Sequence, residues 1–134
     1  MKQNIVWTEL KSLIQIMKEA DVIITPIAQT DGQIKKRPAL LLREMPKYKD
    51  YLVCGISSQV RQHLKNFDEI ILTTDADFNA SGLTRESVIR LSFLAVVSSN
   101  NIIGTIGSIS PMRYERLLKN LSNYIIKKLS QKGS

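Results

Sequence analysis

The sequence is poor in the residues that build redox and metal sites. Its 134 residues include one cysteine, Cys54, and one histidine, His63. A single cysteine excludes a disulfide within the chain, and one cysteine with one histidine excludes a zinc site of the Cys/His type. Cys54 stands in the apolar stretch "YLVCGI", which is typical of a buried structural thiol rather than of a nucleophile.

Long apolar runs and phosphate-binding glycine loops are also missing. No stretch approaches the roughly 20 apolar residues of a membrane-spanning helix. Charge interrupts the N-terminal segment "MKQNIVWTELKSLIQIMKEAD" before a signal-peptide core could form. The segment "GTIGS" lacks the spacing and the lysine of a nucleotide-binding loop. We therefore expect a cytoplasmic protein with no membrane partner and no cofactor.

The overall composition is that of an ordinary globular protein. Hydrophobic residues make up 43% and charged residues 23% of the chain, so we expect residues 1–134 to form one domain with its own core. Nineteen lysines and arginines against twelve aspartates and glutamates give a net charge of +7. This excess favours a polyanionic partner such as RNA or DNA, with solubility as the alternative explanation.

Apolar runs of strand length dominate the middle of the chain. A polar turn centred on Asp31 and Gly32 separates the first two runs, and residues 74–86 hold enough turn formers to predict a long ordered loop. The last run contains two glycines that would permit a bend or a close backbone approach. The predicted strands are residues 21–27, 37–43, 50–56, 68–73, 87–91, 93–97 and 102–109.

Helical periodicity is confined to the two ends of the chain. Residues 8–19 predict a short amphipathic helix capped by Thr8, and Ser110 with Pro111 predicts the start of a longer C-terminal helix. Short strands followed by a helix indicate an α+β fold in which a strongly bent antiparallel sheet closes into a small barrel. The C-terminal helix should present an apolar face (Tyr114, Leu117, Leu118, Leu121, Tyr124, Ile125 and Leu129) and a polar, mostly basic face (Arg113, Arg116, Lys119, Asn123 and Lys127).

Few polar side chains could act in catalysis. If residues 37–43 and 50–56 pair as antiparallel neighbours, the start of one lies beside the end of the other, and Arg37 comes near Ser57 and Ser58. A guanidinium fork and hydroxyl donors suit a phosphate group. The alternative is that these residues only mark strand ends. Asp75 and Asp77 could hold a cation, but a turn-forming role is favoured in so basic a chain.

Five blocks of sequence resemble one protein family in order from about residue 20 to residue 130. They are "ADVIITPI", "KKRPALLL", "YLVCGISSQ", "FNASGLTRESVIRL" and "IGSISP", followed by the C-terminal helix. The chain is identified as a member of the MazF/PemK family of toxins. The resemblance implies an SH3-like barrel, preceded here by an extra N-terminal helix over residues 1–19. It also implies a sequence-specific, metal-independent endoribonuclease that cuts single-stranded RNA, forms a homodimer and is inhibited by a cognate antitoxin.

The resemblance also assigns residues. Arg37 matches the catalytic arginine of the family's Lys-Arg-Pro motif, and Ser57 matches the hydroxyl residue of its Ile-Thr-Ser-Gln motif. Serine replaces the usual threonine, so we expect reduced precision rather than inactivity. His63 would be the better-tuned base if it reached the site, although no family motif supports it. The expected RNA contacts are Lys35, Lys36, Ser58, Gln59, Arg61, Phe78 and Arg85, with burial as a loop anchor the alternative for Phe78.

Two other functions remain open at this point. A related barrel, the CcdB type of gyrase poison, inhibits a protein without catalysis and uses a tryptophan close to its C-terminus. Here the only tryptophan is Trp7 and the chain ends in "KKLSQKGS". The other alternative is a basic barrel that binds RNA without cutting it.

Overall fold

The computed structural model describes residues 17–128 of the chain. Residues 8–16 of the predicted N-terminal helix, and Trp7, lie outside these residues, and residues 17–19 are not helical. The described elements are β1 (Asp21–Ala28), β2 (Ile34–Glu44), β3 (Asp50–Ser57), η1 (Val60–Gln62), β4 (Glu69–Ile71), α2 (Phe78–Ser81), β5 (Ser87–Ser98), η2 (Ser99–Asn101), β6 (Gly104–Ser108) and α3 (Pro111–Ile125).

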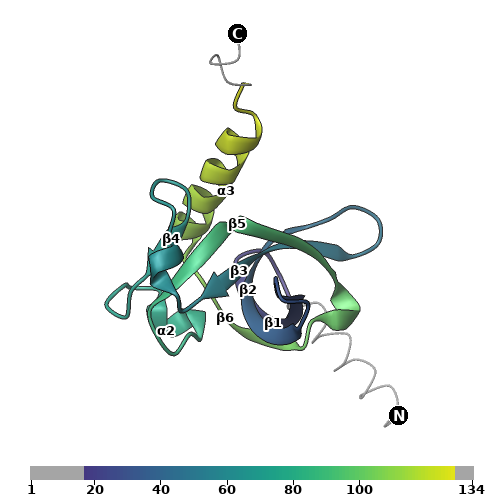
Figure 1. Ribbon diagram of the computed structural model, residues 1–134. Helices are drawn as coiled ribbons and strands as arrows, with labels where there is room; N and C mark the ends of the chain where they lie inside the picture. Colours follow the sequence, from purple (N-terminus) through teal and green to yellow (C-terminus); the bar gives the residue numbers. More distant parts are fainter. Residues whose placement is uncertain (1–16, 129–134) are drawn as a thin grey trace, which may run out of the picture.

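Six antiparallel strands form one curled sheet in the order β4-β5-β3-β2-β1-β6. The sheet curls into a partly closed barrel, and α3 crosses behind β4 and β5 and projects beyond the sheet (Figure 1). The predicted α+β fold with a strongly bent sheet and a C-terminal helix is confirmed. No helix within residues 17–128 is long and apolar enough to cross a membrane.

The turn between β1 and β2 is tighter than the sequence predicts. Gly32 takes a left-handed φ of 84° and donates its N–H to the carbonyl of Gln29 at 3.0 Å. Because the turn closes within a few residues, β2 begins at Ile34 rather than at Arg37. Lys35 and Lys36, which the sequence places in the turn, are therefore exposed strand residues.

A single bent strand replaces the two that residues 87–91 and 93–97 predict. The pairing of β5 with β3 shifts between Cys54, which pairs with Leu94, and Gly55, which pairs with Arg90. The extra residues bulge out of the ladder, and Ser92 in the bulge donates its N–H to the carboxylate of Asp68 at 3.3 Å. The polar Ser92 interrupts the apolar pattern without ending the strand, because this bulge lets β5 bend with the sheet.

Alternate residues of the central strands belong to two separate cores. On β2, Leu40 and Leu42 pack in the first core, which includes residues of α3, and Ala39 and Leu41 pack in the second. Both faces of β2 are therefore buried, which explains its continuous apolar run. The first core is Val22, Leu40, Leu42, Cys54, Ile56, Ile71, Phe78, Ile89, Leu91, Ile109, Leu117 and Leu121, and the second is Ile23, Ile27, Ala39, Leu41, Tyr51 and Val53.

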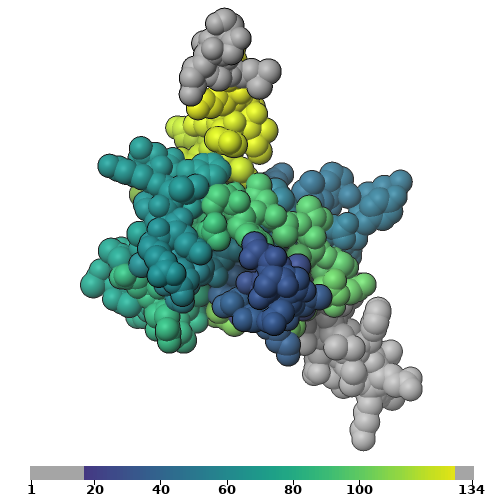
Figure 2. Space-filling view, viewed as in Figure 1, coloured from purple at the N-terminus to yellow at the C-terminus, as the bar shows by residue number. Residues whose placement is uncertain are grey.

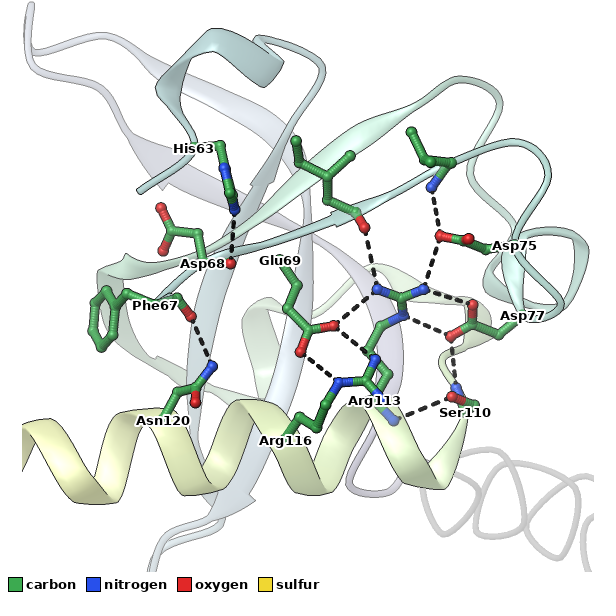
Figure 3. A network of polar contacts seen from close by, with 12 residues as sticks. His63, Phe67, Asp68, Glu69, Asp75, Asp77, Ser110, Arg113, Arg116 and Asn120 are labelled. Carbon is green, nitrogen blue, oxygen red and sulfur yellow. Dashed lines mark hydrogen bonds and ion pairs between the residues drawn. The ribbon is translucent and has the colours of Figure 1, made fainter. Parts of the chain in front are cut away.

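The N-terminus of α3 follows the sequence prediction, with Pro111 in the first turn and the Ser110 hydroxyl accepting the N–H of Arg113 at 3.2 Å. The predicted exposure of Arg113 is wrong, because this residue is only 7% exposed. Its guanidinium donates to Glu69 at 2.9 Å, to Asp75 at 3.0 Å and to Asp77 at 2.9 Å (Figure 3). This network joins α3 to β4 and to the loop before α2.

The predicted apolar face of α3 is buried only in its first half. Leu117 and Leu121 lie in the first core, whereas Tyr124 is 63% and Ile125 68% exposed. The helix extends beyond the edge of the sheet on which it packs (Figure 1), so no strand covers its last turns. Leu129 lies outside the described residues.

The segment predicted as a loop over residues 74–86 contains the short helix α2. Asp75 accepts the N–H of Leu72 at 2.8 Å, in keeping with a turn-forming role, and also binds Arg113. On the facing strand β6, a Cβ at Gly107 would lie only 2.1 Å from the carbonyl oxygen of Ala80. Glycine is therefore required for this close backbone approach, as the sequence suggests for one of the two glycines in this strand.

The Asp77 carboxylate should make the stability of the fold depend on pH in acid. Burial acts to raise its pKa, but hydrogen bonds from Arg113 and from the Ser110 N–H, with the charge of Arg113, lower the pKa from 3.8 to about 2. A lowered pKa stabilises the fold above pH 4, and this contribution of about 2 kcal/mol is lost as the pH falls toward 2.

Urea unfolding between pH 2 and 6 measures this effect. The comparison is with Asp77→Asn, which should be less stable at pH 6 and should show a shallower decline in the free energy of unfolding as the pH falls. Equal slopes for the two proteins would contradict the assignment to Asp77.

Candidate active site

The register of β2 and β3 brings two of the predicted site residues together. Ala39 and Gly55 are the last residues paired between these antiparallel strands, and Arg37 and Ser57 follow at the same end, two residues beyond the pair. Both line an open cavity of about 410 Å³, a volume typical of small-ligand sites. Ser58 and Gln59, which follow β3, also line it. The cavity lies at the end of the strands opposite the β2–β3 hairpin, which projects from the body of the molecule (Figure 1; Figure 2).

The absence of a side chain at Gly55 shapes the cavity. A Cβ at this position would lie 3.3 Å from the ring of Phe93, which comes from the bulged part of β5. Phe93 and Gly55 both line the cavity and give it an apolar surface beside Arg37. The bulge that the sequence does not predict therefore contributes directly to the shape of the site.

Arg90 is a cavity residue that sequence reasoning missed. It lies on β5 opposite Gly55 and lines the same cavity as Arg37. Its Nε atom is buried and has no hydrogen-bond partner among residues 17–128. A buried donor without a partner costs about 1–3 kcal/mol, and a ligand in the cavity would reach this nitrogen only if the side chain shifted. The sequence signal that could have revealed it is the single charged residue in the strand-like stretch "SVIRL".

Ser57 has its hydroxyl oriented by its own backbone. The Oγ atom accepts the N–H of Gln59 at 3.0 Å, in the local turn that serine favours after a strand. Since this bond uses a lone pair of the oxygen, the O–H proton is left to donate to a ligand. Among the described residues that line the cavity, arginine is the only charged type, and carboxylates and imidazole are absent. The site can therefore attract an anion and donate hydrogen bonds to it.

The other predicted RNA contacts lie outside the lining of the cavity. Lys35 and Lys36 are exposed on β2 immediately before Arg37, Arg61 is exposed on η1, and Arg85 is exposed just before β5. The prediction that Phe78 stacks on a base is wrong, because the side chain is 9% exposed and packs in the first core. The alternative considered for it, a buried loop anchor, describes its position.

Two reactive residue types are engaged elsewhere. His63 does not line the cavity, and its Nε2 atom lies 3.0 Å from the backbone oxygen of Asp68 (Figure 3). Burial, with a smaller effect from the charge of Asp68, raises the pKa of the Cys54 thiol far above its ordinary range. Cys54 lies in the first core, so its predicted role as a structural thiol is confirmed.

Comparisons with known proteins bear on the family and the fold of the chain. A family model described as PemK-like, MazF-like toxin of type II toxin-antitoxin system matches residues 18–125. Among solved structures, the toxin MazF-mt6 of Mycobacterium tuberculosis superposes with a TM-score of 0.59 and 20% sequence identity, over 81% of this chain and 99% of that one. At this identity the likeness concerns the fold alone. A comparison with curated proteins gave no match.

Proposed function

Because the chain belongs to the family of PemK-like and MazF-like toxins of type II toxin-antitoxin systems, we propose that it is an endoribonuclease that cleaves single-stranded RNA without a metal ion. The observation that carries the proposal is the convergence of Arg37, Ser57 and Arg90 on one cavity. Two guanidinium groups and a hydroxyl there offer donors to an anion. Within residues 17–128, the lining of the cavity offers a divalent cation no carboxylate.

The proposed reaction uses the nucleophile that RNA carries. The 2′-oxygen attacks the adjacent phosphorus while the bond from phosphorus to the 5′-oxygen breaks, which leaves a 2′,3′-cyclic phosphate and a 5′-hydroxyl end. The 2′-hydroxyl loses a proton and the leaving oxygen gains one, so no external reactant is consumed. An attacking group held beside its target is the main requirement, and single-stranded RNA supplies it once the phosphate is fixed.

The protein contributes position and charge. In the proposal, the fork of Arg37 binds the non-bridging oxygens of the scissile phosphate, on which negative charge grows during attack. The Ser57 hydroxyl donates to the same phosphate, and the guanidinium of Arg90, which lines the cavity from β5, adds a second positive charge. A guanidinium stays protonated at neutral pH, which suits both arginines to charge stabilisation rather than to proton removal.

Two partners belong to the same proposal. A cognate antitoxin would present an acidic, partly apolar segment that covers Arg37 and neutralises the charge of the cavity. The toxin itself would act as a homodimer, as the family resemblance implies. Size-exclusion chromatography with light scattering measures the mass of the toxin alone and of the complex.

Cleavage of a long single-stranded RNA in the presence of EDTA tests the function. We expect cuts at a few defined positions, each leaving a cyclic phosphate. A matched RNA with a single 2′-deoxynucleotide at a mapped position should resist cleavage there and remain sensitive elsewhere, because only the nucleophile has been removed. If folded protein leaves the RNA intact, or if the deoxy substitution has no effect, the proposed chemistry is wrong.

A further inference from the structure

A second hollow lies between the chain after η1 and the last turns of α3. Its volume is about 420 Å³, and no residue of the first cavity lines it. One wall comes from Leu64, Asn66 and Phe67, and the other comes from α3 with Asn120, Asn123 and Tyr124. This is the part of α3 that extends beyond the sheet (Figure 1). Tyr124 is exposed and does not pack in the core, and it lines this hollow.

The side chains of this hollow match the two kinds of surface on a nucleobase. The rings of Phe67 and Tyr124 lie 5.2 Å apart at 47°, and Tyr124 is mostly exposed, so a flat ring can stack on it. Three asparagines supply donors and acceptors for a base edge. The amide nitrogen of Asn120 donates to the Phe67 carbonyl at 3.3 Å (Figure 3), which leaves the amide oxygen of Asn120 as an acceptor.

The electrostatics of the hollow favour an anionic ligand. Lys127 lines it, and among the described residues no aspartate or glutamate does. Arg61 and Lys65 are exposed on the segment that leads into it. A cation beside stacking rings and amides is the combination that binds unpaired nucleotides, whose bases are apolar on their faces and whose phosphates are charged.

The hollow also adjoins the candidate active site along the chain. Gln62 lines the first cavity and Leu64 lines the second, and two Cα steps of about 3.8 Å put their backbones within about 8 Å of each other. The two cavities are therefore close enough for one RNA strand of several nucleotides to reach both if they open on a common face, and the two-length experiment below tests that.

We propose that the second hollow is an exosite that binds an unpaired base of the RNA strand whose scissile phosphate occupies the first cavity. This inference rests on the proposed function and extends it, because it adds a contact several nucleotides from the cut. A protein partner is the competing occupant. The amides, the cation and the continuity with the first cavity favour RNA over an apolar or acidic protein segment.

Fluorescence anisotropy on RNA of two lengths tests the exosite. The probes are labelled RNAs of about five and about fifteen nucleotides centred on a mapped cut, each with 2′-deoxyribose at the cut so that it stays intact. For Tyr124→Leu we expect Kd for the longer RNA to rise by about 5-fold to 100-fold, since one stacked base is lost. Kd for the shorter RNA should change less than about twofold, because it does not span both cavities.

Matched variants make the result specific. Tyr124→Phe keeps the ring and should bind the longer RNA like the wild type. Tyr48→Leu removes another strongly exposed tyrosine, on the hairpin between β2 and β3, and should have no effect. Asn123→Asp, which changes an exposed amide to a carboxylate of the same shape, should weaken binding of the longer RNA without loss of fold.

The remaining outcomes distinguish failure of the exosite from failure of the proposed function. If wild-type protein cleaves RNA but Tyr124→Leu binds both lengths normally, the exosite is wrong and the proposed function stands. The exosite is equally wrong if Tyr124→Leu weakens self-association or antitoxin binding and leaves RNA binding unchanged. If wild-type protein neither binds nor cleaves RNA, the proposed function fails first.

Discussion

Replacing Arg37 by alanine is expected to lower kcat for RNA cleavage by about 10²-fold to 10³-fold, with a smaller change in KM. The reason is geometric. Arg37 lines the same cavity as Ser57, and its fork would act on charge that develops only as the 2′-oxygen attacks. Single-turnover cleavage of a labelled RNA, in EDTA, measures the rate of the chemical step.

Arg43→Ala is the matched control for charge. Arg43 lies on the same strand and is exposed, with Glu19 as its ion-pair partner at 3.0 Å. Its loss removes one positive charge at the far end of β2, so cleavage should change little. Arg37→Lys keeps the charge without the fork and should be slower than the wild type. Equal losses for Arg37→Ala and Arg43→Ala would mean that overall charge, not a site, determines activity.

Substitution of Ser57 or Arg90, the two other polar residues of the proposed site, should lower the cleavage rate by no more than Arg37→Ala does. Ser57→Ala removes one neutral donor and should cost less than Arg37→Ala, whereas Ser57→Thr should retain activity. Arg90→Met removes the buried donor with similar bulk. We expect this variant to lower kcat, because Arg90 lines the cavity that would bind the phosphate. An unchanged rate would show that the Arg90 side chain only fills space.

Replacing Arg113 by methionine is expected to lower the free energy of unfolding by about 3–5 kcal/mol. The substitution leaves the Asp77 carboxylate, which is 8% exposed, without its cationic partner, and leaves Glu69 with Arg116 alone. Removal of one member of a buried ion pair costs more than the pair contributes, because a charge remains without water or partner. Guanidinium chloride unfolding measures the change.

Arg116→Met is the matched control for this prediction. Arg116 binds the same Glu69 at 2.9 Å, but its side chain is 52% exposed. Exposed ion pairs contribute about 0–1 kcal/mol, so this variant should unfold near the wild-type concentration of denaturant. Similar losses for the two variants would show that burial does not govern the energetics of the network.

Local patterns in the sequence predicted most of the sheet. The apolar runs, the Asp31–Gly32 turn and the Ser110 cap lie where the residues indicate, because each depends on neighbours within a few positions. The placement of Arg37 and Ser57 at one cavity also followed, since a short connection between two strands leaves little freedom in their arrangement. Their part in cleavage stays a prediction.

Features that depend on distant contacts escaped the same reasoning. Helical periodicity places Arg113 on a polar face, and only the carboxylates of β4 and the loop before α2 make its burial possible. Arg90 sits in an apolar strand whose bend is set by the bulge opposite Cys54 and Gly55. The segment that begins at Phe78 has the composition of a loop, and the contacts of Phe78 with the first core, which sequence alone does not show, accompany its short helix.

The burial of β2 on both faces is confined to the middle of the strand, next to the candidate active site. Amide hydrogens of Leu40 and Leu41 lie between two cores and should exchange with solvent only when the whole molecule opens. Arg37 is three residues away on the same strand, where β2 pairs with β1 but no longer with β3. Local opening at this end of β2 should therefore cost less free energy than opening of the core, so a rise in temperature should loosen the proposed catalytic geometry before the fold is lost.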